Sequence, residues 1–191
     1  IETKSIIFIW KKYLKDKNLP NILFYEPLKI ILKDKMQYDK EHDLFMNITS
    51  KYIPKVGNFL EFWRETIVTD PSEEELEIEE ITFLFKKWNN KYNLQITENF
   101  ILDLIRHYYP NVVIIDNKYL LDIKCFIWDK KQDVLNSLEY HRLMHEAGKK
   151  KQLITIATLY QHYVNTDNLT YRVSKRYYEK ICKEELDNNL D

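Results

Sequence analysis

The sequence predicts a mostly helical α+β protein made of tandem winged helix-turn-helix-like units. Three observations carry this prediction: two apolar stripes at helical spacing between residues 78 and 108, a hairpin pattern directly after them, and recurrence of this arrangement along the chain. A pair of helices followed by a β-hairpin is the outline of a winged helix, in which the second helix and the hairpin wing face a partner.

The central unit is the clearest part of the pattern. Apolar residues at helical spacing predict a first helix over residues 78–88, and Thr97 is placed to cap a second one. The second helix is expected to end before Pro110, because proline cannot continue a helix. Residues 112–115 form a β-branched run, and the turn at 116–118 leads into a returning strand over 119–127.

The same pattern recurs about 75 residues apart. Residues 8–13 match residues 83–88 (83 − 8 = 75), and residues 44–48 match 119–123 at the same offset. Ser174 stands where Thr97 caps the second helix of the central unit. We therefore predict a first winged-helix-like unit over residues 1–70, a second with its connecting helix over 71–150, and a partial, helical third unit over 151–191.

The remaining elements follow from the same rules. Ser72 and the acidic residues after it suit the start of the central helix, because carboxylates stabilise a helix N-terminus. Two more helices are predicted in the first unit before residue 59: one over residues 6–14, and one capped by Glu26 with Pro27 in its first turn. A third contains residues 59–63. Further helices are predicted over residues 134–145, which connect the units, over residues 154–164, and after Ser174.

Composition narrows the possible functions. The formal net charge is −1, which argues against a strongly basic nucleic-acid module and requires any basic face to be local, as in residues 151–183. Cys125 and Cys182 have no framework spacing and are expected to be buried thiols in a reducing compartment. No apolar run approaches membrane-spanning length. Because the chain begins at Ile1 rather than Met, we expect it to be a piece of a longer protein.

Catalytic signatures are scarce. There is no Walker A sequence or nucleophile elbow, and two glycines cannot build a glycine-rich phosphate loop, so we expect no ATP hydrolysis, no cofactor and no metal in this chain. His141 and His145 are four residues apart, as metal ligands can be, but no cysteine or glutamate completes a known pattern. A pair of surface histidines is the simpler interpretation.

One enzymatic alternative remains. Asp116 followed by Asp122 and Lys124 resembles the pattern of restriction-type nucleases, in which carboxylates hold Mg²⁺ and a lysine supports the attacking water. The six-residue separation is short for acids on neighbouring strands. In the first unit Asn47 and Thr49 stand at the positions of Asp122 and Lys124, so the repeat explains the strand without catalysis. The nuclease is therefore a minor alternative.

Several segments resemble the C-terminal region of the superfamily III primase-helicases of large DNA viruses, of the poxvirus and giant-virus type. The resemblance covers most of the chain. It lies in Lys55 with residues 59–63, the acidic linker, residues 85–88, and residues 173–180. These are patterns of aromatic and basic residues rather than catalytic signatures.

The resemblance implies a primase domain and a hexameric helicase motor upstream, so that the whole protein would be oligomeric. It also implies that this chain is a non-catalytic accessory tail similar to winged-helix modules, which engage DNA or other replication proteins. The expected location is the host-cell cytoplasm or a viral factory. The sequence pI of about 6.6 departs from that of a strongly DNA-binding tail.

The predicted function is therefore an accessory, non-sequence-specific DNA-binding region, and the alternative is a protein-interaction scaffold of a replication complex. Basic residues clustered on one face would favour DNA, whereas scattered charges beside an exposed aromatic patch would favour a protein partner. Tyr177 and Tyr178, next to basic residues, could stack on single-stranded bases, although at most one is expected to be exposed. The candidate phosphate contacts are Lys29, Lys33, Lys35, Lys118, Lys175, Arg176 and Lys180, followed by Arg106 and His107.

Overall fold

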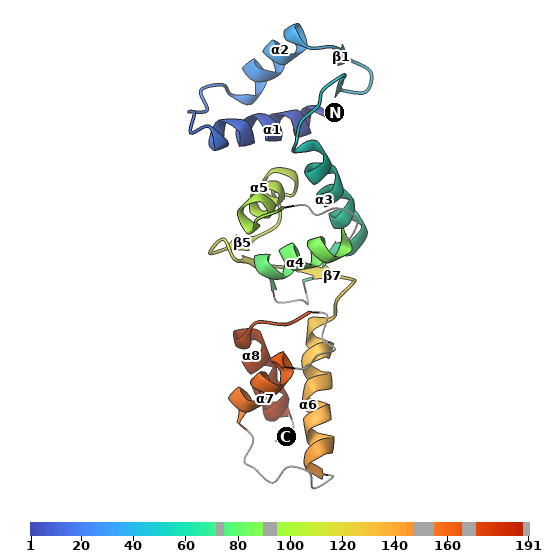
Figure 1. The fold of residues 1–191 in the computed structure, drawn as a ribbon, viewed down its shortest axis with the longest axis vertical. Coiled ribbons are helices and arrows are strands. Elements are labelled where there is room, and N and C mark those ends of the chain that lie inside the picture. Colours follow the sequence, from blue (N-terminus) through green and yellow to red (C-terminus); the bar gives the residue numbers. More distant parts are fainter. Residues whose placement is uncertain (72–74, 90–94, 147–154, 166–170, 189–191) are drawn as a thin grey trace. The chain divides into compact units, whose positions relative to one another are not determined.

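The computed structural model describes residues 1–71, 75–89, 95–146, 155–165 and 171–188 (Figure 1). Over these residues the protein is α+β and about 59% helical, with eight α-helices and small antiparallel sheets. The chain divides into two compact units, Ile1–Lys124 and Cys125–Asp191. None of the helices described is long and apolar enough to cross a membrane.

The first unit begins with two helices and a short hairpin: α1 (Thr3–Asp16), α2 (Tyr25–Lys35), β1 (Tyr38–Asp39) and β2 (Leu44–Phe45). Tyr38 pairs with Phe45 across the hairpin, and Glu2, just before α1, forms an isolated bridge with Leu44. The buried cluster of this part is small and consists of Ile6, Ile7, Leu28, Leu32 and Phe45.

The rest of the first unit repeats this order with a helix in front. Its elements are α3 (Ile53–Thr66), β3 (Ile67–Thr69), β4 (Leu76–Glu77), α4 (Ile78–Trp88), α5 (Glu98–Tyr108), β5 (Ile114–Ile115), β6 (Tyr119–Leu120) and β7 (Ile123–Cys125). The three-stranded sheet has the order β4-β6-β5 and β3 pairs with β7. Phe59, Phe62 and Phe85 form a buried aromatic core, with ring centroids 5.3–6.2 Å apart.

Local signals explain where α4 and α5 begin. A capping box joins Glu77 and Glu80 at the start of α4, each side chain accepting from the backbone of the other. Thr97 caps α5 by accepting a hydrogen bond from the Phe100 amide, as predicted. The predicted cap at Ser72 lies outside the described residues.

The offset of 75 residues has a structural counterpart in the backbone. The bridge between Glu2 and Leu44 is matched by the pair Glu77 and Tyr119, each partner 75 positions further on. Asn47 and Asp122, also 75 apart, both adopt positive φ values, 54° and 57°. Asparagine and aspartate tolerate this left-handed conformation better than most residues. The two halves of the first unit therefore share a strand register and a turn.

The second unit contains three helices, α6 (Lys130–Glu146), α7 (Ile156–Val164) and α8 (Lys175–Asn188). Ser174 accepts a hydrogen bond from the Tyr177 amide, as predicted for a cap. Tyr178 is fully buried, and its ring lies 5.0 Å from that of Tyr163 and 5.4 Å from that of Tyr160.

Two local predictions are wrong. The returning strand predicted over residues 119–127 is broken into β6 and β7, because Asp122 turns the backbone with its positive φ. Glu26 does not cap α2, because the helix already begins at Tyr25. Its N-cap residue is Phe24, whose side chain makes no capping hydrogen bond. The boundaries at residues 70 and 150 separate sequence repeats and stay predictions. They differ from the boundary between the two compact units of the structure, which lies after Lys124.

Candidate functional surfaces

The three candidate lysines of α2 each have a partner within the chain. The Lys29 ammonium lies 3.3 Å from Asp43, and Lys35 lies 2.7 Å from Asp34. Lys33 sits over the ring of Tyr38, 4.2 Å from its centroid. These contacts are on the surface and individually weak, but they lower the positive charge that α2 offers to a phosphate.

Two more candidates form contacts at the hairpin after α5, Lys118 within its turn and Arg106 from α5. Lys118 forms an ion pair of 3.2 Å with Glu77, whose side chain is only 4% exposed. This partner raises the pKa of Lys118, chiefly through its hydrogen bond to Glu77. Arg106 donates to the side chain of Asn117 in the hairpin turn. The pairings fix the hairpin against β4 and α5.

His107 lies on α5, next to Arg106, and the last three candidates are on α8. Lys175 lies 3.6 Å from Glu179 one turn later, and Arg176 and Lys180 are exposed. Tyr177 and Tyr178 are both buried, so neither offers a stacking surface for bases. The three α8 cations belong to the second unit, and the other six candidates belong to the first. Within the first unit, the cations of α2 and of the hairpin lie on separate elements.

The nuclease pattern has a structural explanation. Asp122 occupies a turn of positive φ that its counterpart Asn47 shares, and Asp116 is in the left-handed hairpin turn with φ of 52°. Both acids therefore suit the backbone conformation at their positions. Among the residues described, no group of three or more His, Cys, Asp and Glu side chains is arranged as a metal site.

The histidine prediction needs correction. His141 is buried rather than on the surface, and its ring lies 5.2 Å from that of His162 on α7. The side chain of His145 lies outside the part of the chain that is described. Both cysteines are buried thiols that form no disulfide, as the sequence predicts.

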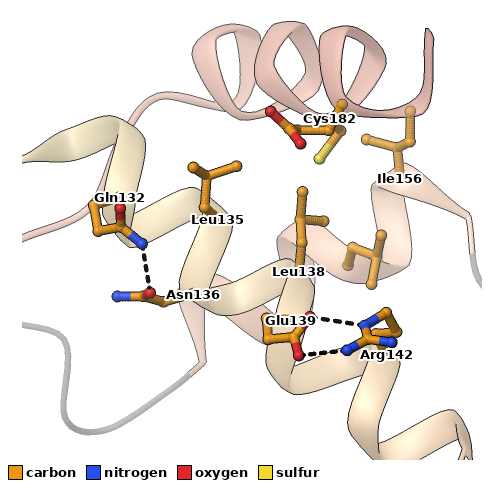
Figure 2. Close-up of a pocket in the computed structure, with 10 residues that line it drawn as sticks. Gln132, Leu135, Asn136, Leu138, Glu139, Arg142, Ile156 and Cys182 are labelled. Carbon is orange, nitrogen blue, oxygen red and sulfur yellow. Dashed lines mark hydrogen bonds and ion pairs between the residues drawn. The ribbon is translucent and has the colours of Figure 1, made fainter. Parts of the chain in front are cut away.

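The second unit has a groove between its three helices, with a volume of about 530 Å³ (Figure 2). Leu135, Leu138 and Ile156 give it apolar walls, and Glu139 accepts two hydrogen bonds from Arg142 at its edge, of 2.7 and 2.8 Å. Cys182 also lines the groove, but burial raises the pKa of its thiol to about 11. The reactive thiolate is therefore disfavoured at neutral pH.

The most unusual surface is apolar and lies on α2 and the residues before it. Phe24 is 81% exposed, Ile30 66% and Ile31 44%, and Leu19, Ile22 and Tyr25 are exposed as well. We call these six residues the α2 apolar surface. The sequence does not reveal this surface, because Leu28, Ile31 and Leu32 follow the apolar spacing that is typical of the buried stripe of a helix.

The equivalent helix in the second half of the unit is covered. Both α2 and α5 have 11 residues, but α2 buries two side chains and α5 buries six. Phe8 of α1 meets Phe100 of α5 edge-on at 5.8 Å, and Trp63 of α3 stacks on Tyr109 at 4.4 Å. Helices α1 and α3 therefore cover α5, whereas the apolar side chains of the α2 apolar surface are exposed.

No protein-family model, curated protein or solved structure matches this chain. The expected relation to viral primase-helicases therefore depends on the resemblance of sequence segments alone.

Proposed function

We propose that this chain is a non-catalytic protein-interaction region in which the α2 apolar surface docks an amphipathic helix. The observation that carries the proposal is the difference between α2 and α5, two equivalent helices of which only α5 is covered. Exposed apolar patches on otherwise polar surfaces commonly mark protein-interaction sites. An amphipathic helix in an apolar groove is a common way to cover such a surface.

The repeat suggests the chemistry of the partner. In the second half of the first unit, α3 covers α5 with an aromatic side chain, Trp63, placed against Tyr109. When α2 and α5 are aligned by their first residues, Tyr25 and Glu98, the offset is 73, and Ile31 and Met36 correspond to Leu104 and Tyr109. A helix with an aromatic stripe like that of α3 would therefore cover Ile31 and Met36. The partner we propose is therefore an amphipathic helix of the α3 type.

A winged-helix-like architecture is part of the same proposal. The order of elements from α3 to β6, which is helix, two strands, two helices and hairpin, supports it, together with the sheet order β4-β6-β5. The resemblance to viral primase-helicases would make the partner another replication protein or another part of the same polypeptide, in the host-cell cytoplasm or a viral factory.

The probe for this proposal is a labelled peptide of residues 53–66, the sequence of α3, added to the chain and followed by fluorescence anisotropy. We expect saturable binding that Ile30→Asp weakens at least tenfold. Leu143→Asp, on an exposed site of α6, is the matched control and should leave binding unchanged. Equal binding by the wild type and Ile30→Asp would contradict the proposal.

DNA binding is a second candidate function. It is favoured by the exposed cations Arg176 and Lys180 on α8, the helix that corresponds to α5 in the third repeat. The test is anisotropy of single-stranded, duplex and forked DNA at several salt concentrations, with the double variant Lys175→Glu and Arg176→Glu. Affinity that falls linearly with salt on logarithmic axes and is lost in this variant would support a DNA module, and no binding at low salt would refute it.

A further inference from the structure

A small pocket of about 240 Å³ lies between α1 and α5 in the first unit. Its lining is Phe8, Lys11, Lys12 and Lys15 from α1 and Asp103, Arg106 and His107 from α5. Four cations face one carboxylate, which is a formal excess of three positive charges with His107 neutral. The pocket is below the roughly 300–1,000 Å³ of ordinary small-molecule sites, so its size and charge favour a small anion.

The carboxylate offsets two of the lysines. Asp103 accepts from Lys15 at 3.1 Å through both oxygens, and Lys12 lies 3.5 Å away. Within the described residues Lys11 has no hydrogen-bonded or ion-paired partner. Arg106 uses one terminal nitrogen to reach Asn117, which leaves guanidinium N–H groups available. Lys12 also lies 3.6 Å from Asp16, which is not part of the lining. Two of the three excess positive charges are therefore those of Lys11 and Arg106.

His107 is oriented by the backbone of α1. Its Nε2 lies 2.8 Å from the carbonyl oxygen of Lys4, and since a carbonyl can only accept, Nε2 carries a proton. Nδ1 is then the nitrogen that gains a proton when the ring becomes charged. Burial, followed by the charges of Lys11 and Lys4, lowers the pKa of His107. Arg106 and Asp103 are the charged groups that face the pocket from the histidine's own helix.

We propose that this pocket binds a phosphate group as its dianion, with Lys11 and Arg106 donating to the phosphate oxygens and His107 donating through Nδ1 once its ring is charged. A dianionic phosphate monoester matches the charge excess better than a backbone diester, which carries one negative charge. Charge-assisted hydrogen bonds of this kind are the strongest that side chains make. The site is independent of the α2 apolar surface, which lies on another helix.

The probe is inorganic phosphate, titrated at constant ionic strength while the ring signals of His107 are followed by NMR. We expect a saturable shift and a rise of about one unit in the pKa of His107, since a bound anion favours the charged ring. Lys11→Gln and Arg106→Gln should each weaken binding about tenfold. Lys11→Gln removes an exposed side chain without a partner and is expected to fold normally. Lys87→Gln, on the exposed side of α4, is the control.

A shift that does not saturate, that chloride reproduces, or that persists in both pocket variants would overturn the proposal. Oligonucleotides with and without a 5′-phosphate distinguish the source of the phosphate. Tighter binding of the phosphorylated strand assigns the pocket to a nucleic-acid terminus, whereas saturable binding of inorganic phosphate alone assigns it to a free phosphate.

Discussion

Truncating two equivalent residues, Leu104 of α5 and Ile31 of α2, should have very different effects on stability. Leu104 is fully buried, so Leu104→Ala removes packed methyl groups and leaves a cavity, at a cost of about 2–5 kcal/mol. Ile31 is 44% exposed, so Ile31→Ala forfeits only about 1 kcal/mol of burial. The better helix propensity of alanine returns roughly 0.5 kcal/mol. The expected difference between the two variants is therefore at least about 1.5 kcal/mol.

Urea unfolding followed by tryptophan fluorescence suits this comparison, because three of the four tryptophans, Trp10, Trp63 and Trp88, belong to the first unit. Circular dichroism should be recorded in parallel, since a chain of two units need not unfold in one step. If Ile31→Ala proves as costly as Leu104→Ala, then α2 is covered in solution and the reasoning behind the docking surface is refuted.

Three further predictions concern local structure and pH. Thr97→Ala should destabilise the first unit by about 1 kcal/mol through loss of the α5 cap, and Thr97→Ser should not, as measured by urea unfolding. Asp122→Ala should lower the unfolding free energy, whereas Asp122→Gly should leave it nearly unchanged, because glycine adopts the φ of 57° at this position without strain. Equal effects of the two substitutions would show that the backbone conformation is not the reason for an aspartate here. Burial raises the pKa of Tyr178 to about 12 from 10.0, so the unfolded chain releases this proton first, and the unfolding free energy should fall as pH rises from 10 towards 12. This fall should be smaller in Tyr178→Phe, and an unchanged fall would show that Tyr178 is not its source.

Sequence patterns located most helices correctly because their signals are local. The Thr97 and Ser174 caps, and the end of α5 before Pro110, each depend on a few neighbouring residues. The repeat offset also has a counterpart in the structure, in the paired strand positions and in the shared turn at Asn47 and Asp122. Those positions are constrained by backbone conformation as well as by apolar character.

The candidate surfaces could not be predicted in the same way, because exposure depends on tertiary packing. Ile31 follows the apolar spacing of an inner stripe, yet among the described residues no helix covers it as Trp63 of α3 covers the end of α5. The sequence marked the lysines of α2 as candidate phosphate contacts, but Asp43, Asp34 and the ring of Tyr38 lie against them in the folded chain. The pocket between α1 and α5 brings together residues about 90 positions apart, and no local motif marks it.

The most direct test of the proposed docking function is amide hydrogen exchange of the chain with and without a saturating peptide of residues 53–66. Exchange reports local opening, and a docked helix should slow it where the surface becomes covered. We predict that protection rises in α2, around Ile31 and Leu32, and stays unchanged in α5 and α8. Protection that increases elsewhere, or nowhere, would contradict the account of α2 as the open docking helix.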